Sequence, residues 1–258
     1  MTSPKFHPQS VFMYHGIIAG SGDVPPGREP GADRYDVPLQ TFSRQMQWLK
    51  DSGCSVSLAG PDTPSAPVVI TFDDGEMNNF TRALNVLRGL GFPAYFFVTV
   101  NRVGAQGYMG WGELSELARA GMAVGSHGLT HRILTGLPDA ELKSELEESR
   151  CVLEGRLGIA VKDFSVPRGF YDEKVVEAAM AAGYQKIFVS ESAPHHPRCV
   201  GRVAVQSSWS QKRFEMAVEG KVPAGEKVFN ICKETCKAVL GGAGYDRLRS
   251  ALLKGPSR

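Results

Sequence analysis

Residues 68–75 read Val-Val-Ile-Thr-Phe-Asp-Asp-Gly. Five β-branched or aromatic residues in a row, followed by a turn signal, predict a short buried strand that ends abruptly at the acidic pair. Asp73 and Asp74 would then lie together at the carboxyl end of a strand. Because neighbouring carboxylates repel one another, the pair either binds a cation or splits its pKa values. The alternative is a simple turn, since Asp-Asp-Gly is favourable turn chemistry.

Short apolar runs alternate with helical patterns on both sides of this stretch. The predicted strands are 11–15, 94–98, 122–125, 164–166, 186–190 and 203–206, and the predicted helices are 80–90, 111–120, 139–157 and 172–182. Repeated strand-helix order predicts an α/β barrel of parallel strands, whose carboxyl ends carry the active site. We expect one catalytic domain over residues 1–220, with a C-terminal helical extension over 221–258 packed on it. The Gly/Pro-rich stretch 16–38 is predicted to be a long and therefore often functional loop.

Composition and charge indicate a globular protein and argue against a nucleic-acid-binding or membrane-spanning one. A hydrophobic fraction of 42% and a charged fraction of 22% in 258 residues are typical of a globular protein. The net charge is +2 and the basic residues are dispersed, so we expect no nucleic-acid partner. The five cysteines form no Cys-x-x-Cys pair, and the sequence has neither a signal-peptide pattern nor an apolar stretch of about 20 residues. We therefore expect a cytoplasmic protein without a membrane span, whose oligomeric state the sequence leaves open.

His127 and His131 follow the predicted strand 122–125 and are four residues apart. If the segment makes a helical turn, this spacing brings both imidazoles to one cation. A lone histidine is usually an ordinary surface or core residue, but two at this spacing favour a metal site. With one carboxylate they would form a three-ligand set that leaves positions for water and substrate. We expect a divalent metal ion there, with Zn²⁺ favoured.

Taken together, these motifs resemble those of the NodB-like polysaccharide deacetylases, carbohydrate esterase family 4. That family has a Thr-Phe-Asp-Asp-Gly motif, here residues 71–75, and a Ser/Thr-His-x-x-x-His motif, here residues 126–131. The resemblance covers residues 11–206 in strand-helix order. It implies a distorted (β/α) barrel of the NodB type. It also implies a metal-dependent hydrolase that removes an N-acetyl or other N-acyl group from an amino sugar or glycoconjugate.

The resemblance also assigns roles to the four polar residues. Asp73 would be the general base, while Asp74, His127 and His131 would hold the metal. This division is physically reasonable, because a divalent ion lowers the pKa of water and polarises the amide carbonyl, while an unligated carboxylate removes the proton of the water.

The third motif of the family, Arg-x-Pro-Tyr, is altered in residues 165–171, which read Ser-Val-Pro-Arg-Gly-Phe-Tyr. Aligned on Pro167, Ser165 replaces the arginine that orients the base, and Arg168 replaces the aromatic residue. We expect Arg168 to restore the missing cation and its backbone N–H to act as the oxyanion donor. The alternative is a surface turn with Arg168 in solvent.

The late Leu-x-x-His motif, which supplies the general acid in this family, is absent after Gly201. The stretch 12–15, Phe-Met-Tyr-His, has the same shape, and circularly permuted members carry this strand at the N-terminus. We therefore predict that His15 is the general acid, although it could have only structural hydrogen bonds. His195 and His196, in a Pro-flanked loop, are rival candidates.

Trp111 and Tyr171 are candidate substrate-binding residues, because sugar C–H faces pack on aromatic rings, although aromatic residues are more often core. Two rival functions remain. One is a related deformylase or amidase that acts on a non-polymeric substrate, and the other is a catalytically inactive carbohydrate-binding relative. The exact sugar and acyl group, and whether the substrate is a polymer or a nucleotide- or lipid-linked precursor, are not predicted.

Overall fold

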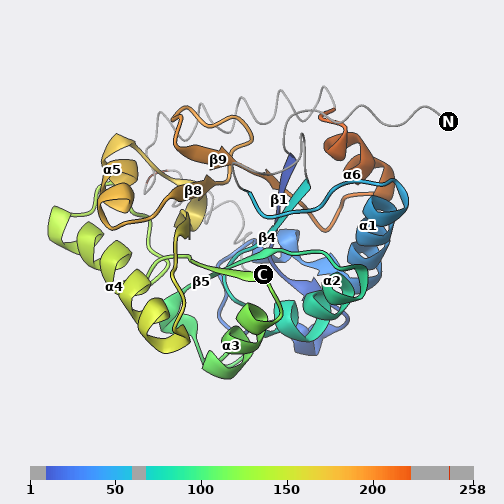
Figure 1. The fold of residues 1–258 in the computed structure, drawn as a ribbon, viewed down its shortest axis with the longest axis horizontal. Coiled ribbons are helices and arrows are strands. Elements are labelled where there is room, and N and C mark those ends of the chain that lie inside the picture. The colour runs from blue at the N-terminus through green and yellow to red at the C-terminus, as the bar shows by residue number, and fades with distance from the viewer. Residues whose placement is uncertain (1–9, 60–67, 222–243, 245–258) are drawn as a thin grey trace, which may run out of the picture.

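The computed structural model describes residues 10–59, 68–221 and 244. Within these residues, eight strands form one sheet in which neighbours pair in parallel, and the helices surround it (Figure 1). In their order across the sheet, the strands are β10 (Val203–Ala204), β1 (Ser10–Tyr14), β4 (Val68–Phe72), β5 (Tyr95–Val98), β6 (Ala123–Ser126), β7 (Asp163–Ser165), β8 (Lys186–Val189) and β9 (Cys199–Gly201). The expected distorted parallel α/β barrel of the NodB type is confirmed.

The helices follow the predicted alternation. They are α1 (Leu39–Asp51), α2 (Leu84–Leu90), α3 (Trp111–Arg119), α4 (Asp139–Leu157), α5 (Glu173–Ala181) and α6 (Gln211–Val218). Shorter elements are the strands β2 (Ile17–Ile18) and β3 (Val37–Pro38), the π-helical turn η3 (Asn79–Ala83), and the 3₁₀ turns η1 (Ser21–Asp23), η2 (Ala32–Tyr35), η4 (Val100–Arg102) and η5 (Pro167–Gly169). The helix predicted over 139–157 coincides with α4. Its acidic first turn complements the helix dipole, and Gly158, with a φ of 66°, caps its C-terminus.

One short stretch nearly closes the barrel. β9 pairs with β8, and β10 pairs with β1, where Phe12 lies opposite Val203. Only Arg202 separates β9 from β10 in the chain, so residues 199–204 reach from one edge of the sheet to the other. The sequence does not predict β9, because Cys-Val-Gly is too short to show strand periodicity. Arg202 therefore lies at the seam of the barrel.

The side chains inside the barrel are apolar in the middle of the strands and polar toward the carboxyl ends of the strands. In β4, Val69 belongs to the interior cluster, whereas Ile70 packs between the strands and the helices. The apolar interior residues are Val11, Ala59, Val69, Tyr95, Phe97 and Phe188. By the alternation of a strand, Thr71 and Asp73 follow Val69 on the same inward face. The first aspartate of the acidic pair therefore faces the interior of the barrel, at the carboxyl end of β4.

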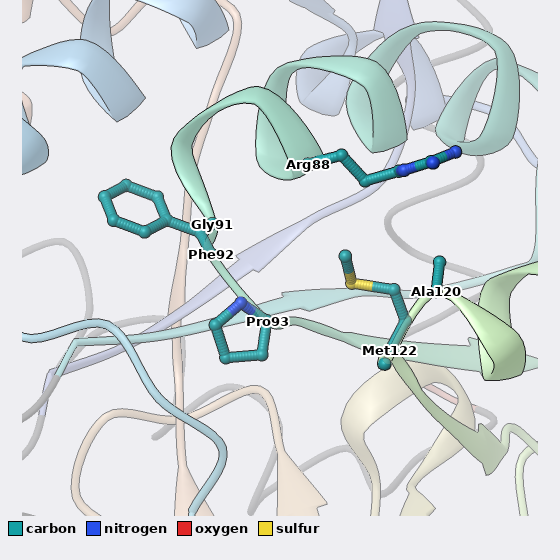
Figure 2. A pocket seen from close by; sticks show the side chains of 7 residues that line it. Arg88, Gly91, Phe92, Pro93, Ala120 and Met122 are labelled. Atoms are coloured by element: carbon teal, nitrogen blue, oxygen red, sulfur yellow. The ribbon is translucent and has the colours of Figure 1, made fainter.

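A hollow of about 380 Å³ lies at the other end of the barrel (Figure 2). Its lining includes Pro93, two residues before β5, and Met122, directly before β6. It therefore opens at the amino ends of the strands, whereas the acidic pair lies at their carboxyl ends.

In the part of the chain that the structure describes, no helix combines the length and apolar character that a membrane span needs. The predicted helical extension over 221–258 lies outside the described residues, except for its first residue and residue 244.

Candidate metal and catalytic site

The acidic pair forms a tight turn at the end of β4. Asp74 has a φ of 74° and Gly75 a φ of 76°, left-handed conformations that aspartate and glycine tolerate better than most residues. The backbone N–H of Asp73 donates to the carbonyl oxygen of Tyr14 in β1 at 3.0 Å, which ties the turn to the neighbouring strand. The pair therefore does form a turn, and this turn directs the two carboxylates to different partners. Cation binding by the pair stays a prediction.

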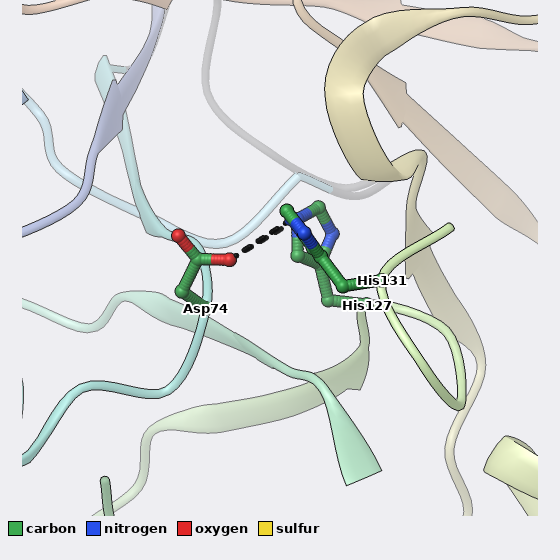
Figure 3. Close-up of side chains that lie close together, drawn as sticks. All are labelled: Asp74, His127 and His131. Atoms are coloured by element: carbon green, nitrogen blue, oxygen red, sulfur yellow. Dashed lines mark ion pairs between the residues drawn. The ribbon is translucent and has the colours of Figure 1, made fainter. Parts of the chain in front are cut away.

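Asp74, His127 and His131 converge on one point (Figure 3). One potential ligand atom of each lies within 4.8 Å of the others. Asp74 Oδ1 is 3.1 Å from Nε2 of His131 and 3.8 Å from Nε2 of His127. The Nδ1 atom of His127 is 2.8 Å from the carbonyl oxygen of Ser165, and that of His131 is 2.7 Å from a carboxylate oxygen of Glu29. Both rings can therefore donate through Nδ1 and offer Nε2 to a divalent cation, so the donor set fits a metal ion.

The two histidines converge without the helical turn that their spacing suggested. Residues 127–131 form an irregular loop with positive φ values of 78° at Gly128 and 64° at His131. The segment therefore does not make the helical turn that was the condition for this convergence, and the two rings meet by another route. A left-handed glycine reverses the chain and brings the second imidazole back toward the first.

Glu145 of α4 fixes the conformation of this loop through hydrogen bonds. Its buried carboxylate accepts hydrogen bonds from the backbone N–H groups of Leu129 at 2.9 Å and Thr130 at 3.0 Å, and also from the Thr130 hydroxyl. These bonds satisfy backbone donors that a helix would otherwise satisfy internally. Sequence reasoning missed Glu145, which has no signal beyond being an acidic residue on a helix.

Asp73 is held by a different set of partners. Arg202 donates to its two carboxylate oxygens at 2.7 and 2.8 Å, and the Ser165 hydroxyl donates at 3.1 Å. The remaining donors of this fully buried guanidinium reach the Ser165 hydroxyl at 2.7 Å, the Thr71 hydroxyl at 3.2 Å and the Val189 carbonyl at 3.3 Å. All five N–H groups of Arg202 are therefore used, and the guanidinium cannot turn away from Asp73.

The arginine at Asp73 is thus Arg202 rather than the expected Arg168. Arg168 has a φ of 62°, and its Nη1 is 3.8 Å from a carboxylate oxygen of Glu29 at the rim of the site. The small Ser165 contacts both Asp73 and Arg202. One signal could have identified Arg202, since it is a charged residue inside the otherwise apolar stretch 199–205.

The two aspartates are both held ionised, but by different groups. Burial raises the pKa of the Asp73 carboxyl, but Arg202, with smaller contributions from His127 and His15, lowers it further, so that the pKa ends below its ordinary value. Burial also raises the pKa of Asp74, and His131 outweighs it and brings the pKa well below the ordinary value. An ionised Asp73 can accept a proton, while an ionised Asp74 can bind a cation.

The two histidines differ in charge. Burial lowers the pKa of His127 to about 4, so its ring is neutral at pH 7. Burial also lowers the pKa of His131, but Asp74 and Glu29 outweigh it and raise the pKa to about 9. Without a metal ion, His131 therefore carries a proton that a cation would have to displace.

His15 lies at the end of β1, beside β4 and the acidic turn. Its ring packs on Tyr35 with 5.0 Å between the ring centroids, and its carbonyl oxygen accepts a bond from Asn79 at 2.6 Å. Its Nδ1 atom is buried and has no hydrogen-bond partner among the described residues. The rival His195 has a 64% exposed side chain 3.2 Å from Glu191, and His196 lies 3.3 Å from Glu173.

The two predicted substrate-binding aromatics lie in different surroundings. Trp111 begins α3, and the guanidinium of Arg156 lies over its ring at 5.6 Å from the centroid. Tyr171 stacks on His195 with 4.4 Å between the ring centroids, and its hydroxyl contacts Glu191. Neither contact tests a role in sugar binding, which stays a prediction for both residues.

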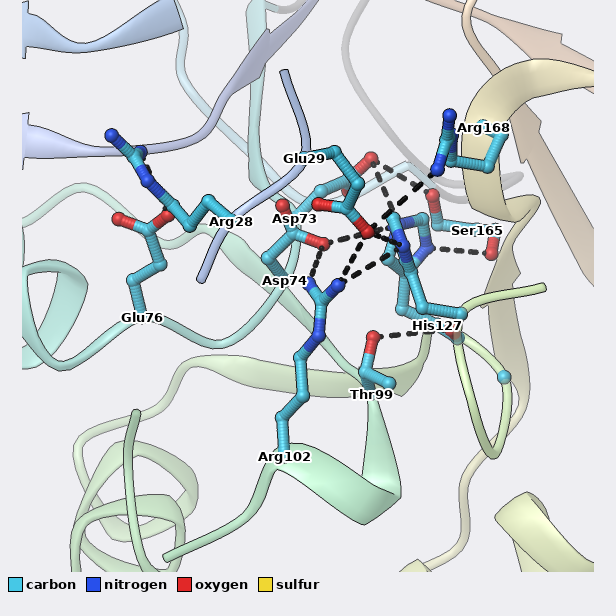
Figure 4. A network of polar contacts seen from close by, with 12 residues as sticks. Arg28, Glu29, Asp73, Asp74, Glu76, Thr99, Arg102, His127, Ser165 and Arg168 are labelled. Carbon is cyan, nitrogen blue, oxygen red and sulfur yellow. Dashed lines mark hydrogen bonds and ion pairs between the residues drawn. The ribbon is translucent and has the colours of Figure 1, made fainter. Parts of the chain in front are cut away.

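A network of charges extends from the site into the long loop 16–38 (Figure 4). Glu29 of that loop contacts Arg102 at 2.6 Å, and Arg102 reaches Asp74 Oδ1 at 2.9 Å. The adjacent Arg28 pairs with Glu76, directly after the acidic turn, at 3.1 Å. The loop is therefore attached to the site at two successive residues, neither of which sequence reasoning selected.

Comparison with known proteins gives a consistent set of relatives. Residues 60–187 match the polysaccharide deacetylase family. The Bacillus subtilis protein YxkH is 29% identical over 222 residues, which are 81% of this chain and 75% of that protein. A crystal structure of a polysaccharide deacetylase from Bacillus cereus matches with a TM-score of 0.71 and 25% identity, over 83% of this chain and 69% of that chain. A Bacillus cereus peptidoglycan-N-acetylglucosamine deacetylase is 27% identical over 124 residues, 48% of this chain and 56% of that protein.

Replacing Arg202 by methionine should destabilise the fold, because it leaves the Asp73 carboxylate buried without its cation. Loss of one partner of a buried ion pair costs about 3–5 kcal/mol. The unpaired Asp73 would have a raised pKa, so the loss should be largest at pH 8 and should shrink as the pH falls through that raised pKa. Urea unfolding at pH 8 and pH 5 measures this difference. Arg198→Gln, an exposed change four residues earlier, is the control. Equal free energies of unfolding for Arg202→Met and wild type would contradict the stabilising role of Arg202.

Binding of a divalent cation should release a proton, because the pKa of His131 is about 9 in the metal-free protein. At pH 7 we expect about one proton released for each Zn²⁺ bound, and affinity that rises roughly tenfold per pH unit until pH 9 is approached. Calorimetric titration in buffers of different ionisation enthalpy measures the released protons. Zinc binding that is independent of pH between 6 and 8 would contradict the proposed protonation of His131.

Proposed function

Because the chain belongs to the polysaccharide deacetylase family, which its residues 60–187 match, we propose that it is a metal-dependent hydrolase that removes an N-acetyl or other N-acyl group from an amino sugar or glycoconjugate. The observation that supports this proposal most strongly is that the two residues of the acidic pair have different partners. Asp74 faces two imidazoles that can bind a cation, whereas Asp73 faces a fixed arginine. One carboxylate is thus available for metal binding and the other for proton transfer.

Asp74, His127 and His131 would hold the cation, and we favour Zn²⁺ because it accepts mixed nitrogen and oxygen ligands with an open position. Such an ion would lower the pKa of a water molecule and polarise the amide carbonyl. Asp73 acts as the general base that takes the proton of the attacking water. Its Oδ2 is 3.9 Å from Nε2 of His127, so it borders the cation site without belonging to it.

His15 is proposed as the general acid that protonates the leaving nitrogen. An amine departs poorly as an anion, so a proton must reach it as the C–N bond breaks. The position of His15 beside the acidic turn and its buried, unpartnered Nδ1 support this role. The N-terminal strand would then take the place of the family's late motif, as a circular permutation implies.

The substrate class is proposed from the family and from one relative named as a peptidoglycan-N-acetylglucosamine deacetylase. An N-acetylated hexosamine is therefore the first substrate to test. Trp111 and Tyr171 as sugar contacts, the backbone N–H of Arg168 as the oxyanion donor and a cytoplasmic location remain predictions.

Substitutions at the acidic pair should separate metal binding from proton transfer. Asp74→Ala, His127→Ala and His131→Ala should each lose most of the metal and the activity. Asp73→Asn should keep the metal but lose about 10²–10⁴-fold in turnover, because an amide cannot accept the water's proton. Acetate and formate released from N-acylated amino sugars, together with bound metal, are the measurements. If Asp73→Asn lost the metal while Asp74→Asn kept it, the two roles would have to be exchanged.

His15→Ala should bind metal and substrate normally but lose roughly 10²-fold or more in turnover, because the leaving amine would lack its proton donor. The alkaline limb of the pH–rate profile, which reports loss of the acid's proton, should also disappear or shift. His196→Ala, which removes a rival histidine paired with Glu173, serves as the control. Near-normal turnover in His15→Ala would exclude His15 and direct attention to His195 and His196.

A further inference from the structure

Glu29 lies in the loop 16–38, far in sequence from both metal-ligand motifs, yet it contacts one of the proposed ligands. Its Oε1 is 2.7 Å from Nδ1 of His131, on the side of the ring away from Asp74. The same oxygen is 2.6 Å from Nη2 of Arg102. Glu29 is therefore outside the set of three ligands but in direct contact with one of them.

The two proposed ligand histidines are oriented in different ways. The Nδ1 atom of His127 faces a neutral acceptor, the carbonyl oxygen of Ser165 at the end of β7, which the barrel holds in place. The Nδ1 atom of His131 faces a charged acceptor that comes from a loop. His131 itself lies in an irregular segment with a φ of 64°, so the surrounding backbone constrains it less than a strand would.

The loop that carries Glu29 is itself anchored. Arg28 donates to both carboxylate oxygens of Asp36 at 2.6 Å and to Glu76 at 3.1 Å, and all three side chains are at most 9% exposed. Because Arg28 is fixed in this way, the next residue is presented toward the acidic turn and His131. Arg102 contributes as well, since it bridges Glu29 and Asp74 and offsets the repulsion between these two carboxylates.

We propose that Glu29 is a positioning residue, which fixes the tautomer and orientation of His131 and thereby makes cation affinity depend on the loop 16–38. The inference rests on the proposed function and goes beyond it, since it adds a residue outside the ligand set and outside the matched residues 60–187. The physical reason is that a carboxylate on Nδ1–H leaves Nε2 as an acceptor and increases its basicity. Loss of such a partner typically weakens metal binding about 10–100-fold.

The test compares Glu29→Ala, Glu29→Gln and the control Asp33→Asn, which changes an exposed acidic residue of the same loop. Zinc affinity is measured by competition with a chromophoric chelator. We expect about 10–100-fold weaker binding for Glu29→Ala, a smaller loss for Glu29→Gln, whose amide oxygen still accepts the Nδ1–H bond, and wild-type affinity for Asp33→Asn.

Nitrogen-15 NMR of the histidine rings provides a second readout that a general loss of stability would not produce. In the zinc-loaded protein, the Nδ1–H signal of His131 should shift or broaden in Glu29→Ala and be partly restored in Glu29→Gln. The signal of His127 should not change in either variant. Circular dichroism and thermal unfolding verify that each variant is folded.

The possible failures are distinguishable. If wild-type protein binds no zinc, both the proposed cation site and the role of Glu29 are wrong. If wild type binds zinc and folded Glu29→Ala binds it equally well with an unchanged His131 spectrum, only the role of Glu29 is wrong.

Discussion

The contact on which the rest of the structure depends is the bidentate pair between Arg202 and Asp73 inside the barrel. Asp73 directly follows β4, and Arg202 lies between β9 and β10, so this pair joins the first motif of the site to the stretch that nearly closes the barrel. A buried guanidinium is tolerated because all five of its donors are satisfied, and a buried carboxylate is tolerated because the guanidinium faces it. The Arg202–Asp73 pair thus both stabilises the closed barrel and keeps the proposed base ionised.

The acidic turn is the second constraint, because it gives the adjacent residues Asp73 and Asp74 different partners. The left-handed backbone at Asp74 points one carboxylate toward the imidazoles while the other remains in the interior with Arg202. Arg102 then lies on the outer side of Asp74 and Arg202 on the inner side of Asp73. Each carboxylate therefore has its own arginine, and two like charges can be neighbours in the chain without destabilising the fold.

Local patterns in the sequence predict much of this arrangement. The alternation of apolar runs and helical patterns predicts the parallel barrel, and the spacing of Asp74, His127 and His131 predicts their convergence. Contacts between distant segments are not predicted: Arg202, Glu145 and Glu29 reach the site from a seam, a helix and a loop. Glu145 and Glu29 have no local pattern of their own, and Arg202 is marked only as a single charge inside an apolar stretch, which does not say what it contacts. The same limit applies to residues 127–131, where the spacing of the histidines would suit a helical turn but Gly128 and Glu145 produce an irregular loop.

The seam has a consequence for how the molecule assembles. β1 and β10 come from opposite ends of the barrel sequence, with Phe12 opposite Val203, and parallel pairing over such a separation requires the closure of a very long loop. Arg202 can meet Asp73 only when that pairing forms, after nearly the whole barrel has been synthesised. An emerging chain can therefore fold its inner strands while its proposed base still lacks a partner. Folding of the barrel and maturation of the site would then finish in the same late step.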